Sequence, residues 1–235
     1  MPRRGKKIIL ILVEGGSDLI SLELIKKLNI HQEEIAFKIT KGDITSNEHT
    51  TLANCISKVN DKITEFIAES KVKKGDIIKL VHILDTDGTY ISDDNIEIDS
   101  TASNFIYTDD KIIANSKDRV SERNAKKKSI MDKLLITAKI SSIDYELYYM
   151  SCNLDHVLHN RRDILTDEAK KQFSNAFADE YYGREEEFLT FINDDSFKVS
   201  GSYQETWSFI KLNSNSLKRY SNLWLFFEKD EEHSE

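Results

Sequence analysis

Three carboxylates follow directly on apolar segments of this chain and form its clearest chemical pattern. Glu14 comes after the apolar residues 7–13, and Asp85 and Asp87 come after the apolar residues 77–84. If both segments are parallel strands, their carboxyl ends meet at one edge of a sheet, which is where open α/β sheets bind ligands. Converging carboxylates repel one another without a cation, and their hard oxygens suit Mg²⁺ or Mn²⁺. The pattern predicts a divalent metal site.

The hydrophobic pattern supplies the strands that would position these carboxylates. Residues 7–13 form a short continuous run rich in β-branched side chains, which is typical of a strand buried on both faces. Two glycines end this run, and a helix is expected after them. Residues 34–40 predict a second strand, a long amphipathic helix follows, and residues 77–84 predict a third strand. This β-α-β-α-β order predicts right-handed parallel crossovers.

The segments after the third strand are expected to complete one domain around the sheet. Residues 89–118 are polar and acidic, and they predict a loop-rich insertion with one strand near 104–107. A basic helix is expected at about 120–138, and a strand at 145–150.

The sequence therefore predicts an α/β fold, with a mainly parallel sheet flanked by helices. The expected domain spans residues 1–150 and carries the acidic insertion. Residues 151–235 predict a C-terminal extension, helical and with a final strand at 223–227, that packs on the same domain.

Composition limits the location of the protein and its partners. The chain has 235 residues, a formal net charge of −8 and two cysteines. Two cysteines make no disulfide framework, so we expect a protein of the reducing cytoplasm. No apolar run approaches the eighteen or so residues that a membrane span needs, so no membrane partner is expected.

Basic residues gather in two places despite the acidic composition. We interpret both clusters as candidate contacts for nucleic-acid phosphates, while a solvated surface explains them equally well. The candidates are Arg119, Arg123, Lys126, Lys127 and Lys128 on the expected basic helix, and Lys218 and Arg219 near the C-terminus.

The motifs VEGGSD (13–18) and LDTDG (84–88) resemble the E-G-x-x-D and D-x-D motifs of the TOPRIM domain, a Rossmann-like fold of nucleic-acid enzymes. The resemblance implies that Glu14 is an acid/base catalyst or metal contact and that Asp85 and Asp87 hold Mg²⁺. Asp18 matches the last position of the first motif.

A later segment, YYMSCNLDHVLH (148–159), is similar to a stretch of stand-alone TOPRIM proteins of phage defence, such as RloB-like and abortive-infection proteins. Asp155 would take the acidic position of that stretch and join the metal ligands. The resemblance, which extends to OLD-type nucleases, implies a metal-dependent endonuclease that cleaves DNA, tRNA or other RNA as a defence effector. It also implies a separate ATPase partner. The chain contains no G-x-x-x-x-G-K-[ST] phosphate loop, so no use of ATP by the chain itself is expected.

Other readings of the same residues stay open. LDTDGT (84–89) also resembles the nucleophile motif of haloacid-dehalogenase-type phosphatases, in which Asp85 would attack phosphorus and Asp87 would act as acid/base. The acidic pair Asp194 and Asp195 would then complete that site. A non-catalytic TOPRIM binding module is a second alternative, and two plain turns are a third.

Overall fold

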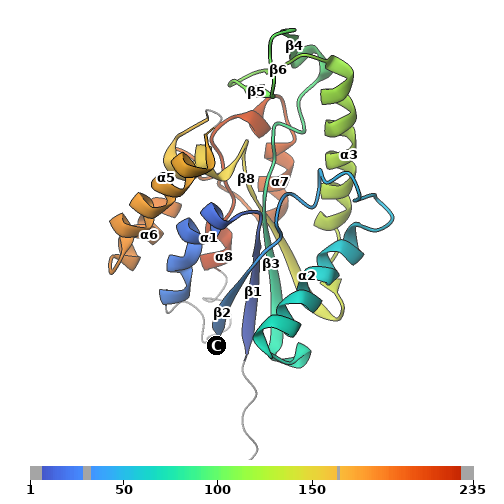
Figure 1. The fold of residues 1–235 in the computed structure, drawn as a ribbon. Coiled ribbons are helices and arrows are strands. Elements are labelled where there is room, and N and C mark those ends of the chain that lie inside the picture. The colour runs from blue at the N-terminus through green and yellow to red at the C-terminus, as the bar shows by residue number, and fades with distance from the viewer. Residues whose placement is uncertain (1–6, 29–32, 163–164, 229–235) are drawn as a thin grey trace, which may run out of the picture.

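A five-stranded sheet forms the centre of the protein, seen in a computed structural model that describes residues 7–28, 33–162 and 165–228. The strand order is β2-β1-β3-β8-β7 (Figure 1). The first four of these run parallel, and only β7 is antiparallel to its neighbour. The strands are β1 (Ile8–Val13), β2 (Glu34–Ile39), β3 (Ile77–Asp85), β7 (Lys139–Ile140) and β8 (Ile143–Met150).

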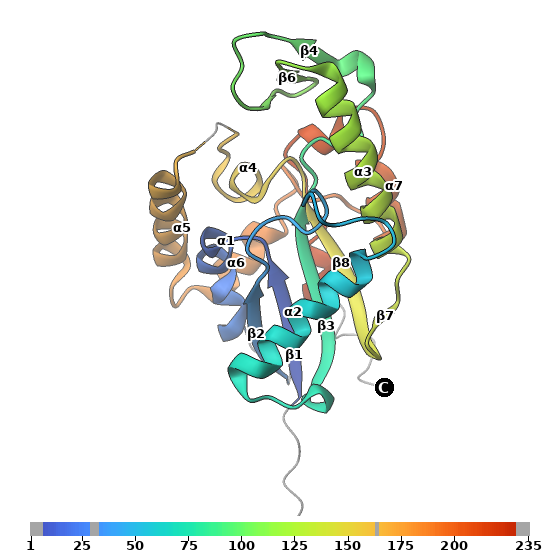
Figure 2. The ribbon, with the colours of Figure 1, turned by 45° about the vertical axis from the view of Figure 1, so that its right-hand side comes forward.

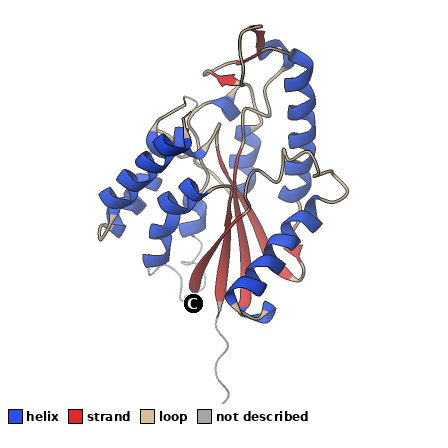
Figure 3. Cartoon of the chain, viewed as in Figure 1, coloured by secondary structure: helices blue, strands red, loops and turns tan. Residues whose placement is uncertain are grey.

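Helices cover both faces of the sheet (Figure 3). One face packs against α1, α4, α5, α6 and α8, and the other packs against α2, α3 and α7. The helices are α1 (Gly16–Leu22), α2 (Cys55–Ser70), α3 (Lys117–Leu135), α4 (Leu154–His159), α5 (Asp167–Tyr181), α6 (Glu185–Ile192), α7 (Tyr203–Ile210) and α8 (Trp224–Glu228).

The composition of β1 follows from this two-sided packing. All six of its residues are buried. Ile9 and Ile11 point into the core on the α1 side, whereas Leu10 and Leu12 point into the core on the α2 side. A strand covered on both faces needs apolar side chains at every position, which explains its continuous run.

The structure confirms the α/β class and the expected strands of the main sheet. The strands predicted at 34–40, 77–84 and 145–150 are found as β2, β3 and β8, and the basic helix is found as α3. The short antiparallel β7 was not expected. It pairs only Lys139 and Ile140 with the start of β8, so it is too short to leave a hydrophobic pattern.

The acidic insertion is more regular than expected. It contains a second sheet of order β4-β6-β5, formed by β4 (Ile96–Ile98), β5 (Ile106–Tyr107) and β6 (Ile112–Ala114). The strand expected near 104–107 is present as β5, and the other two strands were missed. Each has three residues, which is too few to show an alternating pattern. The small sheet packs beside the N-terminal end of α3 through its own apolar cluster (Figure 2).

The predicted final strand at 223–227 is wrong, because residues 224–227 lie in α8 and Leu223 lies in the turn before it. Trp224, Phe226 and Phe227 are buried there, and Phe226 packs edge-on against Tyr148 of β8. A run of five apolar residues does not distinguish a strand from a short buried helix, since both can be apolar throughout.

The segment after β8 supplies helices to both faces of the sheet. α5, α6 and α8 contribute to one core, and α7 contributes to the other. Within the part of the chain that is described, no helix is both long and apolar enough to span a membrane. The first residues of the domain expected at 1–150 and the last of the extension expected at 151–235 lie outside the described residues.

Candidate functional site

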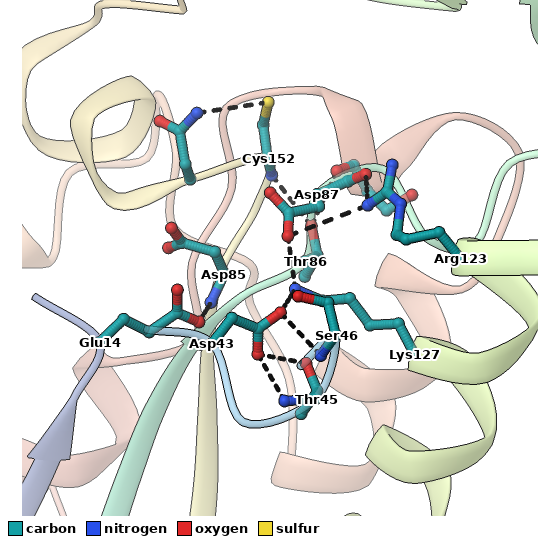
Figure 4. A network of polar contacts seen from close by, with 12 residues as sticks. Glu14, Asp43, Thr45, Ser46, Asp85, Thr86, Asp87, Arg123, Lys127 and Cys152 are labelled. Carbon is teal, nitrogen blue, oxygen red and sulfur yellow. Dashed lines mark hydrogen bonds and ion pairs between the residues drawn. The ribbon is translucent and has the colours of Figure 1, made fainter. Parts of the chain in front are cut away.

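Four acidic side chains gather at the carboxyl edge of the sheet, where three neighbouring parallel strands end (Figure 4). Glu14 directly follows β1, Asp85 is the last residue of β3, and Asp87 lies two residues further on. The fourth, Asp43, stands on the connection that leaves β2. The structure therefore brings together the three carboxylates predicted from the sequence and adds one that was not predicted.

Glu14 and Asp85 are in direct contact at the ends of β1 and β3. The backbone N–H of Asp85 donates a hydrogen bond of 3.2 Å to Glu14 Oε1. Asp85 Oδ1 in turn accepts a hydrogen bond of 2.9 Å from the backbone N–H of Leu154, at the start of α4. Among the residues that the structure describes, neither carboxylate forms an ion pair with a basic side chain.

The electrostatic environment of these two carboxyl groups is unfavourable for their charged forms. Burial raises the pKa of Glu14 well above its ordinary value, and repulsion by Asp43 and Asp85 raises it further. Burial likewise raises the pKa of Asp85, followed by repulsion from Asp18 and Asp87. Attraction by Lys127 lowers both pKa values, but burial and the neighbouring carboxylates outweigh it, and neither group has an ion-pair partner among the described residues.

Lys127 of α3 compensates the other two carboxylates. Its side chain is completely buried, and its Nζ lies 2.7 Å from Asp43 Oδ2 and 2.5 Å from Asp87 Oδ2. Burial lowers the pKa of Lys127, but attraction by Asp43 and Asp87 outweighs burial and raises that pKa above its ordinary value. The ammonium is therefore held in its charged form between two carboxylates.

The connection after β2 presents Asp43 to Lys127. The Asp43 carboxylate accepts hydrogen bonds from the backbone N–H groups of Thr45 and Ser46 and from the Thr45 hydroxyl. Burial raises the pKa of Asp43, but the Lys127 ammonium and these hydrogen bonds outweigh burial and hold the pKa below its ordinary value. Asp43 is thus a charged, fixed acceptor.

Arg123 is the second cation beside the cluster. Its Nη1 donates a hydrogen bond of 2.9 Å to the backbone carbonyl of Asp87 and lies 3.9 Å from the Asp87 carboxylate. Its Nε and Nη2 are buried without a hydrogen-bond partner. Four carboxylates against Lys127 and Arg123 leave a formal charge of −2 on the cluster.

The turn that carries Asp87 is held by backbone and hydroxyl contacts. Thr86 is fully buried, and its hydroxyl donates to the carbonyl of Ser216 and accepts from the N–H of Cys152. Asp87 and Gly88 both have positive φ angles, 50° and 66°. A side chain at Gly88 would clash with Leu217, so only glycine fits this close approach.

The donor set suits a hard divalent cation in its chemistry. The oxygens of Glu14 and Asp85 lack a positive partner, and the cluster has an excess of two negative charges, which one Mg²⁺ would balance. Within residues 7–28, 33–162 and 165–228, no three acidic, histidine or cysteine side chains converge as ligands of one ion do. Asp43 and Asp87 instead face Lys127, which leaves Glu14 and Asp85 as the candidate protein ligands.

The other two predicted metal ligands lie beside the cluster in different roles. Asp18 accepts a hydrogen bond of 2.8 Å from the N–H of Gly15 and so caps its own helix, α1. Burial raises the pKa of Asp18, and its charge contributes to the raised pKa of Asp85. Asp155 on α4 lies 3.8 Å from Lys170 and 3.9 Å from His159. Burial is the largest cause of its raised pKa.

The predicted nucleic-acid-binding face of α3 does not form one surface. Lys127 was predicted to face phosphates, but this is wrong for a surface contact, because its side chain is buried against Asp43 and Asp87. Arg123 also points inward. Lys126 donates a hydrogen bond of 2.7 Å to the carbonyl of Asn47 and so ties α3 to the connection after β2.

The remaining basic residues are accessible to different degrees. Arg119 and Lys128 are exposed on α3. Lys218 is half-buried, and Arg219 is held by a hydrogen bond of 2.9 Å from its Nε to the carbonyl of Val157. Arg119 and Lys128 therefore stay candidates for surface contacts with nucleic acid.

Sequence reasoning missed Asp43 and the role of Lys127, although both leave a trace in the sequence. Asp43 stands shortly after an expected strand, as Glu14 and Asp85 do. Lys127 lies on the buried stripe of α3 together with Val120, Ile130 and Leu134. A lysine in the apolar stripe of an amphipathic helix indicates a buried partner of opposite charge.

Comparisons with models of protein families, with curated proteins and with solved structures found no match for this chain. The connection between this chain and a function therefore lies in its own residues. The main features are the uncompensated pair of Glu14 and Asp85, the pair of Asp43 and Asp87 around Lys127, and the sheet edge where they meet.

Proposed function

We propose that this protein is a Mg²⁺- or Mn²⁺-dependent nuclease that cleaves phosphodiester bonds at the Glu14, Asp43, Asp85 and Asp87 cluster. The observation that carries the proposal is the excess negative charge at the carboxyl ends of β1 and β3. Glu14 and Asp85 are half-buried, close together and without an ion-pair partner among the described residues. A stable protein tolerates such a pair when a bound cation balances it, so the pair indicates a metal site.

In this proposal the two carboxylates would hold the ion, which would supply charge stabilisation for a phosphoryl group. The protein's own groups have distinct roles. Lys127 keeps Asp43 and Asp87 ionised and fixed beside the site. Arg123 donates a hydrogen bond to the backbone carbonyl of Asp87 and so fixes the turn beside the site. Glu14 is the candidate proton acceptor when it is not bound to the ion, because its carboxyl group lies at the end of β1 beside Asp85.

The phosphatase alternative receives less support from the geometry. The acidic pair expected to complete that site, Asp194 and Asp195, lies exposed on the connection between α6 and α7. Asp194 accepts a hydrogen bond from Ser196 there. In the described part of the chain, neither residue is hydrogen-bonded or ion-paired to the cluster.

The resemblance of the two motifs to TOPRIM proteins extends the proposal to a biological role. A stand-alone nuclease of this kind would act as the effector of a prokaryotic defence system against phages, together with a separate ATPase. The non-catalytic alternative predicts the same metal binding without turnover, so activity measurements distinguish the two.

The test is a cleavage assay with purified protein and Mg²⁺ or Mn²⁺. Plasmid DNA, single-stranded DNA, total tRNA and p-nitrophenyl phosphate serve as substrates. We expect metal-dependent cleavage of at least one nucleic acid and no hydrolysis of the small phosphate ester. Hydrolysis of the ester alone would favour the phosphatase, and inactivity on all four with intact metal binding would favour the binding module.

A further inference from the structure

A cavity of about 310 Å³ adjoins the carboxylate cluster, between the connection after β2 and the helix α2. Asp43 lines this cavity and also contacts Lys127, so one side chain borders both the cavity and the cluster. Figure 2 shows the connection from β2 to α2 arching over the carboxyl ends of the strands toward α3. Asp43 therefore joins the wall of the cavity to the carboxylate cluster.

The cavity has buried residues at its base and two lysines on its rim. Thr40, Ile44 and Thr50 are buried at its base. Lys41 and Lys58 stand on its rim, and neither has a carboxylate partner among the described residues.

Other charged groups around the cavity largely cancel. Lys62 pairs with Glu65 at 2.9 Å, and Asp43 shares Lys127 with Asp87. Asp61 is the one remaining acidic side chain, set against Lys41 and Lys58. The six charged side chains of the lining sum to zero, and Lys41 and Lys58 are the two ammonium groups among them without a carboxylate partner in the described part of the chain.

The connection that forms the cavity is held in place from both sides. Lys126 and Lys133 of α3 donate hydrogen bonds to the carbonyls of Asn47 and Leu52. Lys41 and Gly42 have successive positive φ angles of 62° and 106°, which fix the turn that carries Lys41. These contacts hold the connection that forms the wall of the cavity.

We propose that this cavity holds the nucleotide next to the cleaved phosphodiester, with Lys41 and Lys58 facing its phosphate. This inference rests on the proposed nuclease function and adds the substrate class. A volume of about 310 Å³ is at the lower end of small-ligand pockets, so it accommodates one nucleotide and not a base pair. Nucleotides in a duplex are stacked and paired, and they must be unstacked to enter such a cavity. The substrate is therefore single-stranded or contains unpaired nucleotides.

The inference is tested by equilibrium binding, which is independent of turnover. A short fluorescein-labelled oligonucleotide, prepared as single-stranded DNA, as single-stranded RNA and as a duplex, is titrated with protein in Ca²⁺ and again in EDTA. Fluorescence anisotropy gives the dissociation constant at several salt concentrations. The variants are Lys41→Glu and Lys58→Glu. Lys73→Glu is the matched control, because Lys73 is exposed at the far end of α2.

We expect a single-stranded probe to bind more tightly than the duplex. Lys41→Glu and Lys58→Glu should each weaken its binding roughly fivefold to tenfold and flatten the salt dependence, since each removes one phosphate contact. The Lys73→Glu control should bind as the wild type does. Equal binding by all three variants, or a preference for the duplex, would overturn the cavity inference and leave the nuclease proposal standing. A wild-type protein that neither binds nor cleaves any nucleic acid would end both.

Discussion

Lys127 offers the sharpest test of the electrostatic description of the site. Replacing it with methionine keeps most of the side-chain volume but removes the ammonium that lies between Asp43 and Asp87. Breaking a buried ion pair by removing one partner costs roughly 3–5 kcal/mol. The Asp43 and Asp87 side chains are 12% and 24% exposed, so water screens part of the loss. We therefore expect Lys127→Met to lower the free energy of unfolding by about 3 kcal/mol.

For a chain of this size, that loss corresponds to a fall of roughly 6–12 °C in the melting temperature. Differential scanning calorimetry in EDTA measures it, with Lys128→Met as the control, because Lys128 is exposed on the same helix. The excess negative charge of the cluster also rises by one in Lys127→Met. Added Mg²⁺ should therefore restore more stability to this variant than to the wild type. Equal melting temperatures of Lys127→Met and Lys128→Met would refute the reasoning.

Three further predictions follow from the structure. Glu14→Gln should lower nucleic-acid cleavage by a factor of roughly 10² to 10⁴, and full cleavage would contradict the role of Glu14. The melting temperature of this variant should stay equal or rise, because the raised pKa of Glu14 shows that its charged form is unfavourable. Burial lowers the pKa of His82 to about 4, so its contribution to stability is present above pH 6.5 and is lost as the pH falls toward 4. The destabilisation caused by His82→Gln should therefore be about 2 kcal/mol smaller at pH 5 than at pH 7.5 in urea unfolding, and an equal value at both would argue against a neutral buried histidine. Gly88→Ala should lower the free energy of unfolding by at least about 2 kcal/mol, because the φ angle of Gly88 is positive and Leu217 fills the space that a Cβ atom would occupy. Gly75→Ala is the control: a Cβ atom there meets no other atom, so the free energy of unfolding should change little.

The sequence was sufficient for the central sheet because its strands are long, apolar and separated by clear turns. It placed Glu14, Asp85 and Asp87 at strand ends, and parallel strands bring such ends to one edge whatever the details of the loops. It failed for short elements such as β7 and α8. Two to five residues carry no measurable periodicity, and only tertiary packing decides their conformation.

The composition of the site was predicted less completely than its place. Asp43 stands on a loop, and a loop's path depends on contacts that no local pattern reports. Here those contacts include the hydrogen bond from Lys126 to Asn47. The basic residues of α3 were treated as one face, but helical geometry separates the buried Lys127 from the exposed Lys128. Charge clustering in sequence thus does not show which side of a helix a residue occupies.

The central claim is that Glu14 and Asp85 hold a divalent cation, and isothermal titration of Mg²⁺ tests it most directly. The protein is titrated as wild type and as Asp85→Asn, which keeps the shape of the side chain and removes its charge. We predict one Mg²⁺ site in the wild type. The dissociation constant for Mg²⁺ should be at least about tenfold higher in Asp85→Asn, because the variant loses one of the two carboxylate charges that hold the ion. Equal binding by both proteins, or no binding by the wild type, would contradict the assignment.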